Sequence, residues 1–386
     1  MARGTSTGHC SFAPQARHAT IALPRASVGT ARHIDVLGFG TPGARPKAYL
    51  QAGLHADELP GMLVLRRLAG LLSDKAARDE IRGEVVVVPV ANPIGLAQHM
   101  HGYLRGRVES GASANFNRGY ADLAPAAGDA VEGHLGADPA ANVAAIRAAM
   151  AAALATLAPK SELDALRDAL LGLALDADLV LDLHADSEAV VHLYTGTPLW
   201  PDAADVAGEL GAAAVLLAEV SGGNPFDEAV SGPWWALARR FPDAAIPAAC
   251  LAATVELRSN NAVDAALAEA DAAALLRVLM RRGIVAGDPG PLPAAVAATP
   301  LDAMQPVIAP AAGLVVYRAA LGATLAAGDL VAEIVDPLGD AVAVPARTAG
   351  VLFARHEQPI AWPGKVIGKI AGAVPLSERT GALLGD

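Results

Sequence analysis

Residues 50–61 read Leu-Gln-Ala-Gly-Leu-His-Ala-Asp-Glu-Leu-Pro-Gly, and the rest of the chain can be interpreted outward from this stretch. An apolar run that begins near Ala48 is typical of a buried strand, and Gly53 interrupts it. His55 and Glu58 follow three residues apart, before an apolar periodic segment that indicates a helix. A histidine and a carboxylate at the end of a buried strand can bind one divalent metal ion, so a further ligand is expected from a distant part of the sequence.

Strands and helices alternate along most of the chain. Short apolar runs predict strands at 20–23, 33–39, 47–53, 84–90, 177–183, 190–194, 213–217 and 250–257. Helical periodicity predicts helices at 59–72, 139–158, 161–173, 202–210, 234–240 and 263–282. Residues 97–136 and 221–233 are rich in turn-forming residues and are expected to be loops. This alternation predicts an α/β fold with helices on both faces of the sheet, and a ligand beyond the carboxyl ends of its strands.

The composition and hydrophobic pattern of the sequence change after Gly283. Residues 287–300 form a linker rich in Pro, Ala and Gly, and short β-like runs broken by glycines follow from residue 308 to residue 370. This pattern predicts two domains, a larger α/β domain at 1–290 that includes the lead-in strands and an all-β domain at 300–375. Lys365 and Lys369 in the second domain are expected to be surface lysines.

Composition excludes several classes of protein. The formal charge of −11, without a basic stripe, argues against a nucleic-acid partner. Residues 1–24 contain no secretory signal pattern, and no uncharged apolar span of about 18 residues predicts a membrane helix. The only cysteines, Cys10 and Cys250, do not make a disulfide framework or a metal-binding pair. We therefore expect a soluble cytoplasmic protein without a membrane partner, and leave a homo-oligomer open.

A third candidate metal ligand ends the predicted strand 177–183. His184 joins His55 and Glu58 in a set of two imidazoles and a carboxylate, which suits Zn²⁺ with a fourth position for water. Asp182 and Asp186 could orient His184 through its other ring nitrogen. On spacing alone an alternative stays open, in which the first two residues cap a loop and a helix and His184 is a core histidine.

Two further groups have the chemistry of a hydrolytic site. Glu256 closes the predicted strand 250–257 and could act as a general base towards a metal-bound water. Its alternative is an ordinary strand-end glutamate paired with Arg258. The segment 105–118 holds three arginines beside asparagines and glycines, and arginine suits forked recognition of a carboxylate. Its alternative is a solvated loop.

Five short motifs occur along the chain in a fixed order. They are Gly-Leu-His-Ala-Asp-Glu-Leu-Pro-Gly (53–61), Ala-Asn-Pro (91–93), Asn-Phe-Asn-Arg (115–118), Asp-Leu-His (182–184) and Thr-Val-Glu-Leu-Arg (254–258). Together they resemble the succinylglutamate desuccinylase/aspartoacylase family of the zinc carboxypeptidase superfamily, over about residues 34–279. The resemblance implies a zinc-carboxypeptidase-like mixed sheet with helices on both faces, followed by a small all-β domain of the barrel-sandwich type.

The resemblance also implies a role for each candidate residue. It makes His55, Glu58 and His184 the ligands of one Zn²⁺ per chain, and Glu256 the catalytic base and acid. The implied reaction is hydrolysis of the amide bond of a small N-acyl amino acid, carried out by metal-activated water. A zinc carboxypeptidase acting on peptides and a non-catalytic binding protein of the same fold are the alternatives.

The arginine-rich segment supplies the remaining roles that the resemblance implies. Asn117 and Arg118 match the pair that binds the substrate carboxylate, so a small carboxylate-bearing N-acyl compound is the expected partner. A second arginine polarises the scissile carbonyl in this family, and Arg107 is assigned to it, with Arg105 as the alternative.

Overall fold

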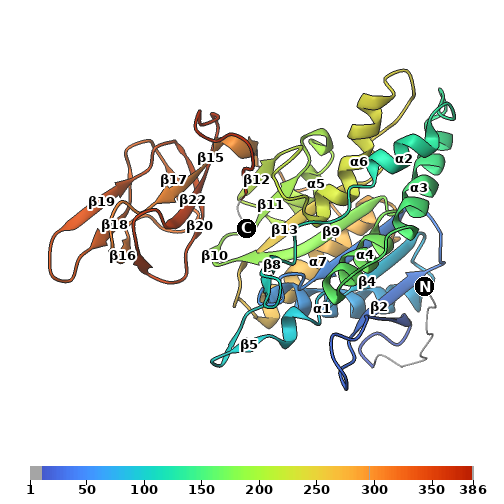
Figure 1. Cartoon of the computed structure of the whole chain (residues 1–386), viewed down its shortest axis with the longest axis horizontal. Helices are drawn as coiled ribbons and strands as arrows, with labels where there is room; N and C mark the ends of the chain where they lie inside the picture. The colour runs from blue at the N-terminus through green and yellow to red at the C-terminus, as the bar shows by residue number, and fades with distance from the viewer. Residues whose placement is uncertain (1–10, 295, 385–386) are drawn as a thin grey trace.

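A computed structural model describes residues 11–294 and 296–384 of the chain. Cys10 lies outside these ranges, whereas Cys250 is buried and carries a free thiol. Among the helices within the described ranges, none is both long enough and apolar enough to cross a membrane. Figure 1 shows two parts, a large sheet covered by helices and a smaller group of strands beside it.

The large part is built on a nine-stranded mixed sheet (Figure 1). In spatial order its strands are β1 (Arg17–Ala22), β2 (His33–Gly40), β4 (Glu84–Val88), β3 (Lys47–Ala52), β9 (Leu179–Asp186), β13 (Leu251–Ser259), β11 (His192–Thr195), β12 (Ala214–Leu217) and β14 (Ala298–Pro300). The central strands β4, β3, β9 and β13 run parallel, while β11 is antiparallel to β13. The mixed α/β architecture expected from the sequence is confirmed.

Helices cover both faces of this sheet because its inner strands are apolar on both sides. One core contains residues of α1 (Pro60–Ala76), α5 (Ala204–Leu210) and α7 (Ala265–Arg281). The other contains residues of α2 (Ala124–Val131), α3 (Pro139–Ala155), α4 (Glu162–Ala174) and α6 (Phe226–Arg240). In β4, Val85 and Val87 belong to the first core and Val86 and Val88 to the second, which is the alternation that a strand imposes.

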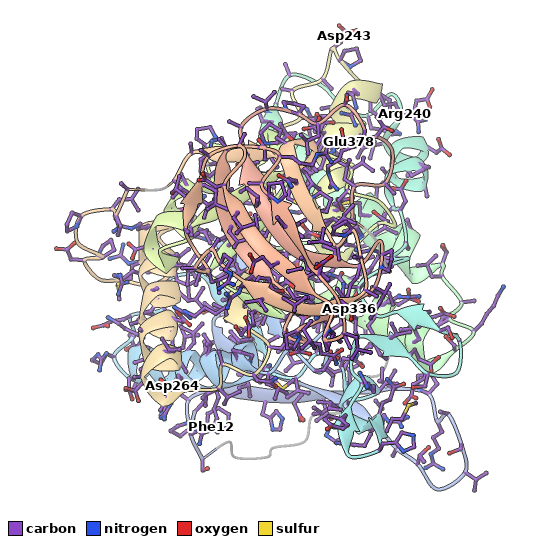
Figure 2. All side chains as sticks on the ribbon, turned by 90° about the vertical axis from the view of Figure 1, so that its left-hand side faces the viewer. Phe12, Arg240, Asp243, Asp264, Asp336 and Glu378 are labelled. Carbon is purple, nitrogen blue, oxygen red and sulfur yellow. The ribbon has the colours of Figure 1, made fainter. Side chains whose placement is uncertain are left out.

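The smaller part, here called the β module, comprises residues 304–372. It contains β15 (Met304–Ile308), β16 (Gly313–Tyr317), β17 (Thr324–Leu325), β18 (Leu330–Val335), β19 (Ala341–Pro345), β20 (Gly350–Arg355), β21 (Ile360–Ala361) and β22 (Val366–Gly372). These strands form two small sheets with their own apolar core. The short strand β10 (Glu188–Ala189) of the large part pairs with β20 and so ties the module to it. Figure 2 looks onto the strands of the module with the large part behind them.

The last strand of the large sheet, β14, lies after residue 290 in the sequence. β14 pairs in parallel with β12, and a turn of 3₁₀ helix, η3 (Leu301–Ala303), leads from it into β15. The ranges 1–290 and 300–375 for the two domains stay predictions.

The expectation of a loop at 221–233 is wrong over its second half. Helix α6 begins at Phe226 and contains Pro233, which the sequence interpretation treated as part of the loop. Phe226, Val230 and Trp234 lie four residues apart and are buried in one core, and this packing outweighs the hydrogen bond that a proline removes.

The predicted loop at 97–136 also contains regular structure. It holds two short hairpins, β5 (His99–Met100) with β6 (Tyr103–Leu104) and β7 (Val108–Glu109) with β8 (Ala114–Asn115), and it ends in α2. Two more single turns of 3₁₀ helix, η1 (Gly95–Ala97) and η2 (Thr197–Leu199), complete the elements of the large part.

Candidate metal centre and active site

The turn after β3 places the first two candidate ligands. Gly53 has a φ of +69°, and a Cβ at this position would lie 2.5 Å from the Cε atom of Met62 in α1. Glycine therefore allows both the turn and the close packing of the helix that follows. His55 and Glu58 leave this turn with buried side chains, at the carboxyl end of the strand.

The third candidate ligand arrives from the neighbouring strand β9. His184 Nδ1 lies 2.7 Å from Glu58 Oε2, and His55 Nδ1 lies 2.9 Å from Glu58 Oε1. One potential ligand atom from each of the three residues lies within 4.8 Å of the other two. The structure thus brings together residues that are up to 129 positions apart, because β3 and β9 are parallel neighbours in the sheet.

The other ring nitrogens of the two histidines face oxygen acceptors. His55 Nε2 lies 2.8 Å from Asn115 Oδ1, and His184 Nε2 lies 2.9 Å from Asp182 Oδ2. These acceptors favour a proton on each Nε2, which leaves the Nδ1 lone pairs directed at the carboxylate of Glu58. Lone pairs that face carboxylate oxygens at such distances repel unless a proton or a metal ion lies between them, so the donor set fits a divalent metal that takes the place of a proton.

Electrostatics within the cluster also favours a cation. Burial alone would raise the pKa of Glu58, but the neighbouring His55 and His184 hold it well below its usual value. Burial likewise opposes the charged form of His184, yet the carboxylates of Asp182 and Glu58 hold its pKa well above the usual value. Without a metal ion, the protonated form of His184 is therefore favoured beside the ionised carboxylate of Glu58, and a metal ion that binds here would replace that proton.

Glu256 lies beside the cluster because β13 pairs with β9 so that Glu256 is opposite His184. Burial, followed by repulsion from Glu58, raises the pKa of Glu256 to about 8. Its Oε2 atom has no hydrogen-bond partner among the described residues. The alternative pairing with Arg258 is wrong, because that arginine forms two hydrogen bonds with Asp271 of α7, at 2.7 and 3.0 Å.

The arginine-rich segment contacts the turn that carries His55 and Glu58 through Gly106. A Cβ on Gly106 would lie 2.2 Å from the backbone nitrogen of Asp57, so only glycine permits this approach. The approach brings Arg107 Nη1 to 3.3 Å from Glu58 Oε1. Arg105 is exposed and does not line the cavity, so the geometry favours Arg107 as the arginine of the site.

Asn117 and Arg118 lie on the other side of the cluster. Asn117 is buried, its Nδ2 lies 3.5 Å from His184 Nε2, and its Oδ1 accepts a hydrogen bond from the backbone nitrogen of Phe226 at the start of α6. Arg118 Nη1 donates to the backbone oxygen of Asn117 at 2.7 Å. Both side chains line the same cavity as Glu58 and His184.

Four residues in or near the site differ from the sequence interpretation. Asp182 orients His184 as expected, but Asp186 pairs with Lys369 of the β module instead. Lys369 lines the cavity and Lys365 is buried, so neither is a surface lysine. Asn115 was not assigned as the partner of His55. Its place in the Asn-Phe-Asn-Arg motif was the available signal, whereas nothing in the sequence pointed to Lys369.

Most of the candidate site residues border one cavity of about 530 Å³, a size typical of small-molecule sites. Its walls include Glu58, Arg107, Asn117, Arg118, His184 and Glu256 from the large part, and Lys369 from the β module. His55 lies behind Glu58, with its side chain almost entirely enclosed. The arrangement combines a candidate metal site, an unpaired carboxyl oxygen and two arginines, which are groups that hydrolytic chemistry uses.

Comparison with solved structures identifies similar folds. A succinylglutamate desuccinylase/aspartoacylase family protein from Shewanella frigidimarina has a TM-score of 0.82 and 25% identity, over 94% of this chain and 99% of that one. A second, from Shewanella amazonensis, has a TM-score of 0.80 and 26% identity, over 91% and 97%. The product-bound ectoine utilization protein EutE from Ruegeria pomeroyi, at 0.65 and 19% over 93% and 95%, shares the fold.

Comparison with known sequences gives a family. No curated protein matches the chain. The model of the succinylglutamate desuccinylase/aspartoacylase catalytic domain matches residues 44–281, which contain the metal cluster, both arginines and Glu256. The match extends over more than half of the chain, and the protein therefore belongs to the succinylglutamate desuccinylase/aspartoacylase family.

Proposed function

We propose that the protein hydrolyses the amide bond of a small, carboxylate-bearing N-acyl amino acid, with one Zn²⁺ held by His55, Glu58 and His184. The observation that carries this proposal is the position of Glu256, whose free carboxyl oxygen shares a cavity with the cluster and with Arg107. Membership of a family of desuccinylases and aspartoacylases, which are hydrolases, supports the reaction type.

The metal ion, when bound, would polarise a water molecule and the scissile carbonyl group. Glu256 accepts the proton of the attacking water and returns it to the amide nitrogen as the carbon–nitrogen bond breaks. Burial and the charge of Glu58 raise the pKa of Glu256 to about 8 without a metal, and a cation bound beside it would lower that pKa and favour the carboxylate that accepts the proton. Arg107 donates to the carbonyl oxygen as negative charge develops there.

Asn117 and Arg118 position the substrate. A guanidinium group binds a carboxylate in a fixed orientation. Asn117 contacts His184 through its side-chain amide and accepts a hydrogen bond from Arg118 at its backbone oxygen. A substrate carboxylate held here would place the next amide bond towards Glu256 and the cluster, which reduces the entropic cost of reaching the transition state.

The alternative activity is that of a zinc carboxypeptidase, since it uses the same groups. It requires a groove open to a peptide chain, whereas residues of the β module and of the segment after it border this cavity. Walls contributed by these two segments favour a small amide. A binding protein without turnover would have no use for the unpaired carboxyl of Glu256. A small molecule is thus the proposed partner, the cytoplasm the proposed compartment, and no nucleic acid or membrane is proposed.

A substrate panel tests the proposal. Zinc-loaded protein is incubated with N-acyl amino acids, dipeptides and longer peptides, and the released amine is measured. We expect turnover of N-acyl amino acids above that of the peptides, and loss of turnover in His55→Ala together with its metal. Preferred cleavage of longer peptides would support the carboxypeptidase, and the absence of all amine release would reject both enzymes.

A further inference from the structure

The chain continues beyond the β module and returns to the large part. Residues 373–384, here called the tail segment, follow β22. In Figure 1 this red end of the ribbon lies between the β module and the large sheet, close to β12. Arg379, Leu383 and Leu384 of the tail segment line the same cavity as the metal cluster.

Backbone hydrogen bonds hold the tail segment in this position. The backbone nitrogen of Leu376 donates to Asp302 of η3 at 3.0 Å. The backbone nitrogens of Leu383 and Leu384 both donate to the carbonyl of Ser221, at 2.8 and 3.1 Å. The tail segment is therefore fastened to the large part at two separated places, one on each side of its turn.

The side chain of Arg379 holds the turn of the tail segment. Its Nη2 atom donates to the backbone oxygen of Leu383 at 2.6 Å, which fixes the direction in which the two leucines leave the turn. This contact acts within the segment, so Leu383 and Leu384 are presented to the cavity as a pair.

The two leucines contribute to an apolar wall of the cavity. They pack against a cluster of buried residues that includes Leu216, Leu301 and Met304, which also line the cavity. The same cavity is also lined by the charged groups of Glu58, His184 and Glu256. Its lining thus combines polar groups for the reaction with an apolar wall that the reaction itself does not require.

We propose that Leu383 and Leu384 determine specificity, and that the substrate carries a bulky apolar group in addition to its carboxylate. This inference rests on the proposed function and names the substrate class within it. Burying an apolar group against this wall removes hydrocarbon surface from water, and that gain distinguishes such a substrate from one with only short groups.

The apolar group can belong to either half of an N-acyl amino acid. It is the acyl chain if the wall lies beyond the carbonyl, or the amino-acid side chain if the wall lies beside the carboxylate clamp. The hydrogen bonds of Ser221 place the wall near the loop that contacts Arg118, where Gly119 donates to the backbone of Gly223 at 2.7 Å. Both possibilities require a hydrocarbon group on the substrate. Ligands that carry this group on the acyl chain or on the amino-acid side chain distinguish the two.

The experiment measures binding, so that it does not depend on turnover. Zinc-loaded protein carrying Glu256→Gln is titrated by calorimetry with N-acetylglycine, N-hexanoylglycine and N-acetylleucine. Leu383→Ala and Leu384→Ala are added singly, and Leu338→Ala is the control, because Leu338 is 98% exposed in the β module and does not line the cavity.

We expect each tail variant to weaken binding of one bulky ligand about tenfold, while N-acetylglycine and the control variant stay unchanged. Weaker binding of N-hexanoylglycine would show that the wall contacts the acyl chain. Weaker binding of N-acetylleucine would show that it contacts the amino-acid side chain. Equal weakening of all three ligands, or none, overturns the inference. If the ligands discriminate as expected but unmodified protein releases no amine, the proposed hydrolysis fails and the apolar wall stands.

Discussion

Glu58 is contacted by three of the side chains on which the account depends. His55, His184 and Arg107 all approach its two carboxylate oxygens within 3.3 Å. The histidines face it through their Nδ1 atoms and would share a cation with it, whereas Arg107 is half exposed and can turn towards a substrate. Burial thus distinguishes the two proposed roles: the buried histidines suit metal ligands, and the half-exposed Arg107 suits a residue that polarises the substrate carbonyl.

The choice between the two arginines gives a matched pair of variants. We expect Arg107→Ala to lower kcat about 10²- to 10³-fold, because a donor to the developing oxyanion is lost, with little change in metal content. Arg105→Ala is the control and should keep nearly full activity, since its side chain is exposed outside the cavity. Steady-state kinetics on an N-acyl amino acid checks both, and similar losses in the two variants would contradict the assignment.

His192 is a buried titratable group between the two parts of the molecule. Its ring lies 4.7 Å from the ring of Phe353 in β20, and its Nδ1 atom donates to the backbone oxygen of Val190 at 2.9 Å. Burial, helped by Lys369 and opposed by Asp186, lowers the pKa of His192 to about 4. The folded protein therefore favours the neutral ring.

This depressed pKa predicts a pH dependence of stability. The unfolded chain binds a proton near pH 6.5, so the contribution of the neutral ring is complete above that pH and is lost as the pH falls towards 4. The loss amounts to roughly 3 kcal/mol at most. Denaturant unfolding between pH 7 and pH 4 should show a shallower decline for His192→Asn. His134→Asn at an exposed site is the control, and an unchanged slope in His192→Asn would refute the explanation.

At the scale of elements, the turn from β3 into α1 positions two of the candidate ligands. Gly53→Ala adds both left-handed strain and a contact 2.5 Å from Met62, and we expect it to lower the free energy of unfolding by about 2–4 kcal/mol. Gly102→Ala separates the two effects, because Gly102 also has a positive φ but has open space around it. It should cost only about 1–2 kcal/mol. Equal losses in urea titrations would show that the contact with Met62 is unimportant.

Elements with a strong local pattern were predictable from the sequence. The β-branched run of β4 and the serine cap of α4, where Ser161 accepts from the backbone nitrogen of Asp164 at 3.0 Å, depend on neighbouring residues alone. Helix α6 was missed at its start because Pro225 and Pro233 suggest a loop, and only the buried spacing of its apolar residues contradicts them. Local turn signals were therefore weighted above a tertiary packing pattern.

In the candidate site, too, some residues could be predicted from local sequence patterns and others could not. His55, Glu58 and His184 could be proposed because each ends or follows a strand, and parallel neighbours bring such ends together. Asn115 and Lys369 could not be assigned in this way, since their contacts depend on how a long loop and a separate group of strands fold back. No periodicity or residue spacing in the sequence indicates such long-range contacts.

At the scale of the whole molecule, the cavity is assembled from three segments. The large sheet supplies the metal cluster and Glu256, the β module supplies Lys369, and the tail segment supplies an apolar wall. The module is therefore part of the cavity that a substrate would occupy, and β10 and the ion pair between Asp186 and Lys369 hold it there.

The central claim is that one metal ion at the cluster and Glu256 together hydrolyse an amide. The most direct measurement compares metal content and amine release for zinc-loaded, chelator-treated and reconstituted protein, beside Glu256→Gln. We predict about one zinc per chain, activity lost with the metal and restored by it, and a Glu256→Gln protein that keeps its zinc while kcat falls about 10²- to 10⁴-fold. Full activity in the metal-free protein, or in Glu256→Gln, would contradict the account.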